Sequence, residues 1–371
     1  MKYQAITIDT SIFDKYGRKL ESGLLNQLTQ FGSSPVWFVI SEVVKSELYR
    51  HILDSTFSSK TKVKGSISSA AQHQLISEEK RNDLIEMFEI DPEVVARERI
   101  DRYLKSVDAT VVPAKGHVDI DELLRIYFEG TAPFSKEGKK KNEFPDAIAL
   151  LSLEDWARNN AATLIAVSTD KDWISYGETS DYIDVVEDLS EALSCFQSLG
   201  VALEFLTNSF FCEPPSNIPD AVHLGIESNL KDELITLTFE PNATGGYFTD
   251  PEDIVEFQDI QIEFGSLKEN KDDFTIVSAN DDEIAFEAPV IVTATASCRF
   301  SLHTMGSNRS EYVGISTAVQ NVDLEMTILI SLRGDFSLPD VKDIEGTLEL
   351  EEAEFVEYVP RIEFGDLVPD E

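Results

Sequence analysis

Hydrophobic and polar residues follow two different periods along the chain, and the change falls near residue 220. Before this point, short runs rich in β-branched residues are followed by longer stretches whose apolar residues recur at helical spacing. One such stretch is residues 41–53, where Ser41 stands at the N-cap position of a predicted helix. This alternation predicts an α/β domain with a largely parallel sheet. The predicted strands are residues 5–8, 36–40, 163–168 and 182–186.

A long polar segment follows the second predicted strand. Residues 58–69 are rich in serine and lysine, and they predict a flexible loop. We expect a helical insertion over residues 55–130, lying beside the sheet. Helical patterns in the second half of this insertion cover residues 78–88, 92–107 and 119–128.

Beyond residue 220 the apolar residues alternate with polar ones, which is the period of a half-buried strand. Turn residues separate the alternating segments, so the pattern predicts an all-β, mainly antiparallel domain, a sandwich or a barrel. Segments of this kind include residues 233–240, 254–264, 283–288 and 289–302. Three prolines at 210–220 indicate a linker, and the predicted domains are residues 1–205 and 221–371, with the linker at 206–220.

Charge divides the chain in the same way. The 371 residues carry a formal net charge of −38, and residues 206–371 hold only 8 Lys and Arg against 35 Asp and Glu, a net charge of −27. Such acidity argues against broad nucleic-acid binding by the C-terminal half. Scattered cysteines and histidines predict no zinc site, and reduced thiols are typical of a cytoplasmic protein. We expect no signal peptide and no membrane partner.

Carboxylates occur where the predicted strands end. Asp9 directly follows the first strand, and Asp170 and Asp172 follow the third. Asp146 stands in the first turn of a helix, and Glu47 lies in the helix after the second strand. In an open α/β sheet, ligands bind outside the carboxyl ends of the strands. Carboxylates gathered there repel one another unless a hard cation such as Mg²⁺ or Mn²⁺ neutralises them, which predicts metal-assisted phosphodiester hydrolysis.

Each of these acids also has a simpler interpretation. Asp9 has the alternative role of a turn residue, and Asp146 that of an acid that complements a helix dipole. Asp172 is either a second ligand or a solvated loop charge. Glu47 competes with Glu42, which lies at the helix start where acids are common.

Four of these segments together resemble a PIN domain, a metal-dependent nuclease fold. They are ITIDTSIF with Asp9, ISEVVKSEL with Glu47, EFPDAIALL with Asp146, and LIAVSTDKDW with Asp170 and Asp172. The resemblance covers only the N-terminal half. It implies a PIN-like α/β domain, Mg²⁺ or Mn²⁺ as cofactor, and cleavage of single-stranded or structured RNA, less often DNA. It also favours Glu47 over Glu42, through the V-x-x-E context.

Residues near the acids suggest supporting roles. Ser168 and Thr169 are expected to orient metal ligands through their hydroxyl groups. Basic residues form two groups that are either solvated loops or contacts for a phosphate backbone: Lys139, Lys140 and Lys141 in one, and Lys60, Lys62 and Lys64 in the other. The alternative to a nuclease is a catalytically silent scaffold whose acidic β domain docks a protein partner. A third possibility is that the β domain mediates homo-oligomerisation and brings two active sites together.

Overall fold

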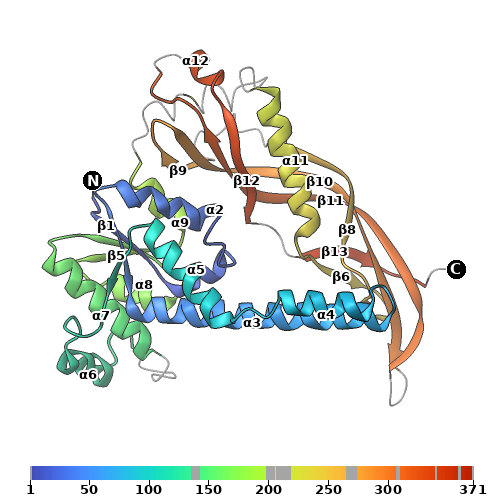
Figure 1. The fold of residues 1–371 in the computed structure, drawn as a ribbon, viewed down its shortest axis with the longest axis horizontal. Coiled ribbons are helices and arrows are strands. Elements are labelled where there is room, and N and C mark those ends of the chain that lie inside the picture. Colours follow the sequence, from blue (N-terminus) through green and yellow to red (C-terminus); the bar gives the residue numbers. More distant parts are fainter. Residues whose placement is uncertain are drawn as a thin grey trace. The chain divides into compact units, whose positions relative to one another are not determined.

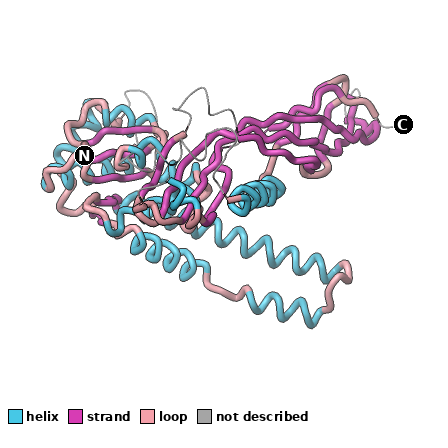
Figure 2. Tube along the Cα trace, turned by 90° about the horizontal axis from the view of Figure 1, so that it is seen from above, coloured by secondary structure: helices cyan, strands magenta, loops and turns pink. Residues whose placement is uncertain are grey.

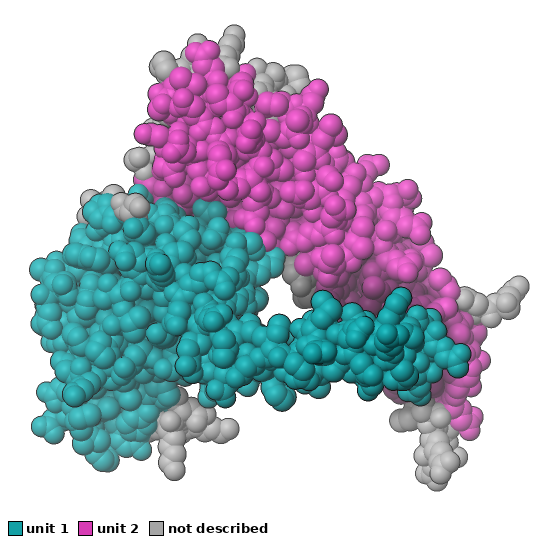
Figure 3. All heavy atoms as spheres, in the orientation of Figure 1, with its two compact units in different colours: residues 1–196 teal, residues 197–371 magenta. Residues whose placement is uncertain are grey.

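The computed structural model of the protein divides into two compact units, Met1–Phe196 and Gln197–Glu371 (Figure 3). Each unit has its own sheets. The predicted linker at 206–220 falls almost entirely outside the residues that the structure describes, so its limits stay a prediction. The described residues are 2–134, 143–197, 205, 219–264, 274–305, 310–338, 341–357 and 361–369.

The N-terminal unit is built on a five-stranded parallel sheet with the order β3-β2-β1-β4-β5 (Figure 1). The predicted α/β architecture is therefore confirmed. The central strands β1 and β4 are buried along their whole length, which explains their continuous apolar sequences. The strands are β1 Ala5–Ile8, β2 Trp37–Ser41, β3 Thr110–Val112, β4 Leu164–Val167 and β5 Ile183–Val186.

Helices connect and flank these strands, and most begin at a residue that the sequence provides as a cap. Ser41 accepts a hydrogen bond from the Val43 amide at 3.2 Å, and Asp9, Asp170 and Asp188 cap their helices in the same way. The helices are α1 Thr10–Lys15, α2 Gly23–Gln27, the 3-10 helix η1 Leu28–Ser33, α3 Glu42–Gln72, α4 Glu78–Met87, α5 Pro92–Ser106, α6 Ile120–Glu129, α7 Phe144–Asn159, α8 Lys171–Gly177 and α9 Leu189–Ser194.

The prediction of a flexible loop at residues 58–69 is wrong. This segment is the middle of α3, a helix of 31 residues. The first turns of α3 are buried through Val44, Leu48 and Ile52, and beyond them only Ala71, near its end, is buried. The remainder packs beside α4 and α5, as Figure 2 shows, and Lys60 and Lys64 pair with a glutamate that follows α4. These tertiary contacts stabilise a helix whose serine-rich sequence has low intrinsic propensity.

The C-terminal unit is dominated by antiparallel strands, as predicted. A six-stranded sheet has the order β12-β11-β10-β7, and β8 and β9 also pair with β10. A separate parallel pair joins β6 to β13. The strands are β6 Glu240–Thr244, β7 Phe248–Pro251, β8 Glu256–Phe264, β9 Thr275–Ala279, β10 Glu283–Met305, β11 Ser310–Arg333, β12 Glu349–Glu357 and β13 Arg361–Asp366. A short helix, α12, spans Val341–Glu345.

Two features of this unit differ from the strands that the alternation of apolar and polar residues predicts. Residues 233–236, predicted to begin a strand, belong to α11, Asp220–Thr236. Its apolar residues at every fourth position, from Val222 to Leu234, are buried against the sheet. The segments 283–288 and 289–302 form a single strand, β10, because Pro289 lies where pairing with β9 ends and pairing with β8 begins.

No helix in the part of the chain that the structure describes combines the length and apolar character needed to cross a membrane.

Candidate active site

The acids predicted from the sequence gather at the carboxyl edge of the N-terminal sheet. Asp9 follows β1 and Asp170 follows β4, and these two strands are hydrogen-bonded neighbours. The strand order reverses between them, since β2 and β3 lie on one side of β1 while β5 lies beyond β4. Such a switch point is where open α/β sheets leave space for a ligand.

Asp9 is held in one orientation by four hydrogen bonds. Its Oδ1 accepts from the Thr10 amide at 2.6 Å, and its Oδ2 accepts from the Ser11 hydroxyl at 2.6 Å. The Ser11 amide and the Ser168 hydroxyl also donate to Oδ2, at 3.3 and 3.0 Å. Only 5% of the residue is exposed, and burial raises the pKa of its carboxyl above the ordinary value although these donors lower it. Asp9 therefore caps α1 and is also an oriented carboxylate.

Ser168 links the two strand ends. Its hydroxyl donates to Asp9 Oδ2 and accepts from the Asp170 amide at 3.0 Å. The residue is fully buried, so this bridge fixes the chain just before Asp170. Thr169 is exposed and its backbone amide donates to the Ser11 hydroxyl at 3.4 Å. The expected orienting role of Ser168 thus has a direct geometric basis, whereas Thr169 contributes a backbone contact.

Asp146 has the most strongly perturbed carboxyl among the four predicted catalytic acids. It lies in the first turn of α7, and its Oδ1 accepts a hydrogen bond from the indole Nε1 of Trp173 at 3.0 Å. Burial raises the pKa of Asp146 to about 7, with further increases from the charges of Asp9, Asp170 and Glu47, while the Trp173 bond lowers it. The negative charges of Asp9, Asp170 and Glu47 therefore each make ionisation of the Asp146 carboxyl less favourable.

Glu47 and Glu42 have different surroundings although they lie on the same helix. Glu47 accepts a hydrogen bond from the Thr10 hydroxyl at 3.0 Å, which ties it to the residue after Asp9. Glu42 Oε1 instead accepts from the backbone amide of Ala114 at 2.7 Å, beyond the end of β3. Glu42 therefore has a structural partner, and Glu47 is the glutamate on the side of the aspartates.

Asp172 lies at the edge of this group of acids. Its amide donates to Asp170 Oδ1 at 2.8 Å, in the capping contact that starts α8. Its own carboxyl is half-buried, and burial, followed by the charges of Asp170 and Glu143, raises its pKa. The charge of Asp170 thus reaches the Asp172 carboxyl, while the hydrogen bond between the two residues uses the Asp172 backbone.

The donor set fits a hard divalent cation. All candidate ligands are carboxylates, which is the chemistry of Mg²⁺ and Mn²⁺ sites. Among the described residues, no three His, Cys, Asp or Glu side chains converge into a direct coordination sphere. The charges nevertheless interact at Asp146. Mg²⁺ usually keeps several waters and binds only one or two carboxylates directly, so a site for it does not require all of these acids to contact the ion.

The structure bears differently on the two groups of basic residues that were predicted as solvated loops or phosphate contacts. Lys139, Lys140 and Lys141 lie outside the described residues, so their contact with nucleic acid stays a prediction. Lys60, Lys62 and Lys64 belong to α3 rather than to a loop. Lys60 and Lys64 both pair with Glu89, which takes up part of their charge within the protein.

Three residues contact the acids without having been assigned a role from the sequence. Thr10 donates a hydrogen bond to Glu47 and Ser11 donates one to Asp9. Trp173 is fully buried and donates a hydrogen bond to Asp146. The signal for the first two is their position directly after Asp9, at the start of a helix. Nothing in the sequence pairs the indole with Asp146, since 26 residues separate them.

Comparison with known families adds to this geometry. Residues 6–173 match a family model for the PIN domain. The matched range includes every candidate acid, from Asp9 to Asp172, as well as Trp173. No curated protein matches the chain. Nuclease activity is typical of this family, so the match indicates a nuclease-type function for the N-terminal unit.

Proposed function

We propose that the protein is a metal-dependent nuclease that hydrolyses single-stranded or structured RNA, because residues 6–173 of its N-terminal unit match a family model for the PIN domain. One observation carries the proposal: the acids come together at the carboxyl edge of the parallel sheet. Ser168 joins the ends of the neighbouring strands β1 and β4 at Asp9 and Asp170. Thr10, the residue after Asp9, bonds Glu47, and Trp173 in the helix that Asp170 caps bonds Asp146. A structural role for these acids would favour spreading such charges apart. Their concentration at one sheet edge is suited to binding a cation.

The cation would be held by Asp9, Glu47, Asp146 and Asp170, with Asp172 at the margin. Mg²⁺ or Mn²⁺ supplies a Lewis acid that polarises a phosphodiester oxygen and lowers the pKa of a water. Hydrolysis by water needs no covalent intermediate, and hence no serine or histidine nucleophile.

The protein's own contribution is to hold the acids in place and to control their protonation. The hydroxyls of Ser11 and Ser168 keep Asp9 Oδ2 in a fixed direction, so little reorganisation is needed when charge develops. Trp173 orients Asp146 and favours its ionised form. In the metal-free site the Asp146 carboxyl must lose its proton before its oxygens can bind a cation.

The direct test is cleavage of labelled single-stranded RNA, single-stranded DNA and duplex DNA in Mn²⁺, with EDTA as the control. We expect cleavage of RNA that EDTA stops. Asp146→Asn removes a charge with little change in volume, so it should lower the rate at least about 100-fold, since even partners of metal ligands cost 10–100-fold. Cleavage of RNA by Asp146→Asn at the unmutated rate would show that the assignment is wrong.

The acidic C-terminal unit has a second role in this proposal. Its net charge of −27 over residues 206–371 suits a basic protein partner or restraint of the nuclease better than contact with RNA. The proposal also places the protein in the cytoplasm, where RNA substrates are present.

A further inference from the structure

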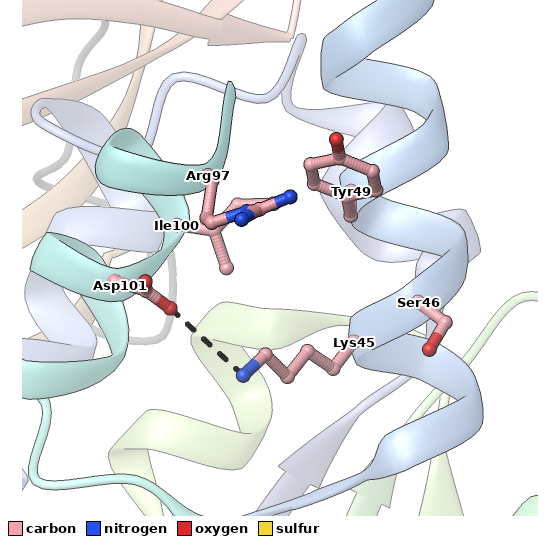
Figure 4. A pocket seen from close by; sticks show the side chains of 6 residues that line it. All are labelled: Lys45, Ser46, Tyr49, Arg97, Ile100 and Asp101. Carbon is pink, nitrogen blue, oxygen red and sulfur yellow. Dashed lines mark ion pairs between the residues drawn. The ribbon is translucent and has the colours of Figure 1, made fainter. Parts of the chain in front are cut away.

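A pocket of about 350 Å³ lies within the N-terminal unit, between α3 and α5. Lys45, Ser46 and Tyr49 line it from α3, and Arg97, Ile100 and Asp101 line it from α5. Figure 4 shows Arg97 extending from α5 toward the side of α3 that carries Tyr49. None of these six residues belongs to the group of acids described above.

The pocket has an excess of positive charge in a strongly acidic protein. It contains two cations and one anion, and Asp101 faces Lys45 at 3.9 Å. Arg97 is exposed and makes no ion pair with any described residue. A guanidinium of this kind is suited to binding a phosphate group through paired hydrogen bonds. The pocket therefore offers one anion site beside an aromatic ring.

The geometry of α3 connects this pocket to the acids. Lys45 and Tyr49 are one turn apart and form one row along the helix, whereas Glu47 lies in a row on the opposite flank. The core side of the helix carries Val44 and Leu48. The row between the two flanks, on the side away from the core, consists of Ser46 and Arg50, both exposed.

The surface from Glu47 across Ser46 and Arg50 to the pocket is thus continuous around one helix. The helix with its side chains is about 10–12 Å across, so the path around its exposed half is roughly 15–20 Å long, a distance that a few nucleotides of a single strand span. Arg50 makes no ion pair with any described residue, so it is available to the same phosphate backbone. A strand bound at the acids and crossing α3 would reach the pocket.

We propose that the pocket between α3 and α5 binds one unpaired nucleotide of the RNA strand, a few nucleotides from the bond that is cleaved, with its base against Tyr49 and its phosphate on Arg97. The volume lies at the lower end of the range for small-ligand sites, which suits a single nucleotide. A base inside a duplex has no free face for Tyr49, so the site selects single-stranded segments. This inference rests on the proposed function and adds where the substrate is held.

Binding to the uncleaving full-length chain tests the proposal. The reference protein carries Asp146→Asn, and the probe is a fluorescein-labelled single-stranded RNA of about 12 nucleotides, measured by anisotropy in Mg²⁺. Adding Arg97→Ala should weaken binding about tenfold and reduce the slope of log K against log salt by about 0.7, the value for one phosphate contact on a single strand.

Two further variants separate stacking from charge. Tyr49→Ala should weaken binding about five- to tenfold with no change in the salt slope, since base stacking is not ionic. Tyr49→Phe keeps the ring and should bind like the reference. Arg102→Ala is the matched control, because it removes the same charge from the exposed surface of α5 without touching the pocket. It should change the affinity less than about twofold.

The outcomes are distinguishable from those of the proposed function. If the unmutated protein cleaves RNA but Arg97→Ala and Tyr49→Ala bind like Arg102→Ala, the pocket is not a nucleotide site and the nuclease assignment stands. If no RNA is cleaved but binding depends on Arg97 and Tyr49, the pocket stands and the nuclease assignment falls. No measurable binding to the reference protein overturns the proposed pocket.

Discussion

The Asp146 carboxyl couples the site to the stability of the fold. Its pKa is raised from 3.8 to about 7 by burial and by three neighbouring acids. The folded protein therefore keeps this proton at pH values where the unfolded chain has lost it. The resulting stabilisation is complete below the unfolded pKa and is lost as the pH rises toward the folded pKa. Above neutral pH the Asp146 carboxyl is ionised in the folded protein as well, so this stabilisation is absent.

Asp146→Asn should remove this contribution to the pH dependence of stability in the metal-free protein. At about pH 8 the variant should be more stable than the unmutated chain by about 1–2 kcal/mol, with partial exposure screening part of the charge. At about pH 3, below the unfolded pKa of 3.8, the two should be nearly equal, because the carboxyl is then mostly neutral in both folded and unfolded states. Urea unfolding in EDTA at both pH values measures the difference. A gain in stability of the same size at both pH values would contradict the electrostatic origin.

Trp173→Phe isolates the effect of one hydrogen bond on metal binding. The indole N–H lowers the pKa of Asp146, so its removal should raise that pKa further. A proton competes with a cation for the same oxygen, so Mn²⁺ affinity should rise with pH through a midpoint that is higher in the variant. Calorimetric titration between about pH 6 and pH 9 gives both midpoints. Equal affinity of the two proteins at high pH is the control for an intact site.

At the scale of elements, α3 carries two glutamates with different tasks. Glu47→Gln should lower RNA cleavage at least about 100-fold with no loss of stability, because it removes a charge on the side of the aspartates. Glu42→Ala removes the acceptor of the Ala114 amide, so it should cost about 1–2 kcal/mol of stability and leave cleavage nearly unchanged. Thermal unfolding and RNA cleavage measured on both variants check the pair. The opposite result would make Glu42 the active-site glutamate.

The sequence predicts elements best where local pattern and tertiary environment agree. The strands before Asp9 and Asp170 are fully buried, and their continuous apolar runs identify them at once. The edge strand β3 was not predicted, because Thr110–Val112 is too short to show a period. Residues 58–69 look like a loop because their serine and lysine side chains favour solvent, yet α4 and α5 hold them in a helix.

In the candidate site, too, the residues that could be predicted are those whose position follows from local sequence pattern. The positions of Asp9, Asp146 and Asp170 are visible in the sequence because each stands at a strand end or a helix start. Their partners are not visible, because contacts such as Trp173 with Asp146 depend on how α7 and α8 pack. The pocket between α3 and α5 is equally hidden, since it joins residues about 50 positions apart.

At the scale of the whole molecule, every residue assigned to the site lies in the unit Met1–Phe196. A chain that ends at Phe196 should therefore fold and cleave RNA by itself. Removal of the acidic unit should also reduce repulsion of RNA, so KM should fall several-fold at low salt and converge with that of the full chain at high salt. Circular dichroism and cleavage at two salt concentrations check this. An unfolded or inactive truncation beside an active full chain would show that the site needs the second unit.

Strand β10 has a consequence for how the protein is made. It pairs with β11 along its length on one side, and with β9, β8 and β7 in succession on the other. All three of those strands precede β10 in the chain, so each emerges from the ribosome before β10 has fully emerged. Until β10 is synthesised, their hydrogen-bonding edges have no template, and such nascent strands are the segments that chaperones guard against misassembly.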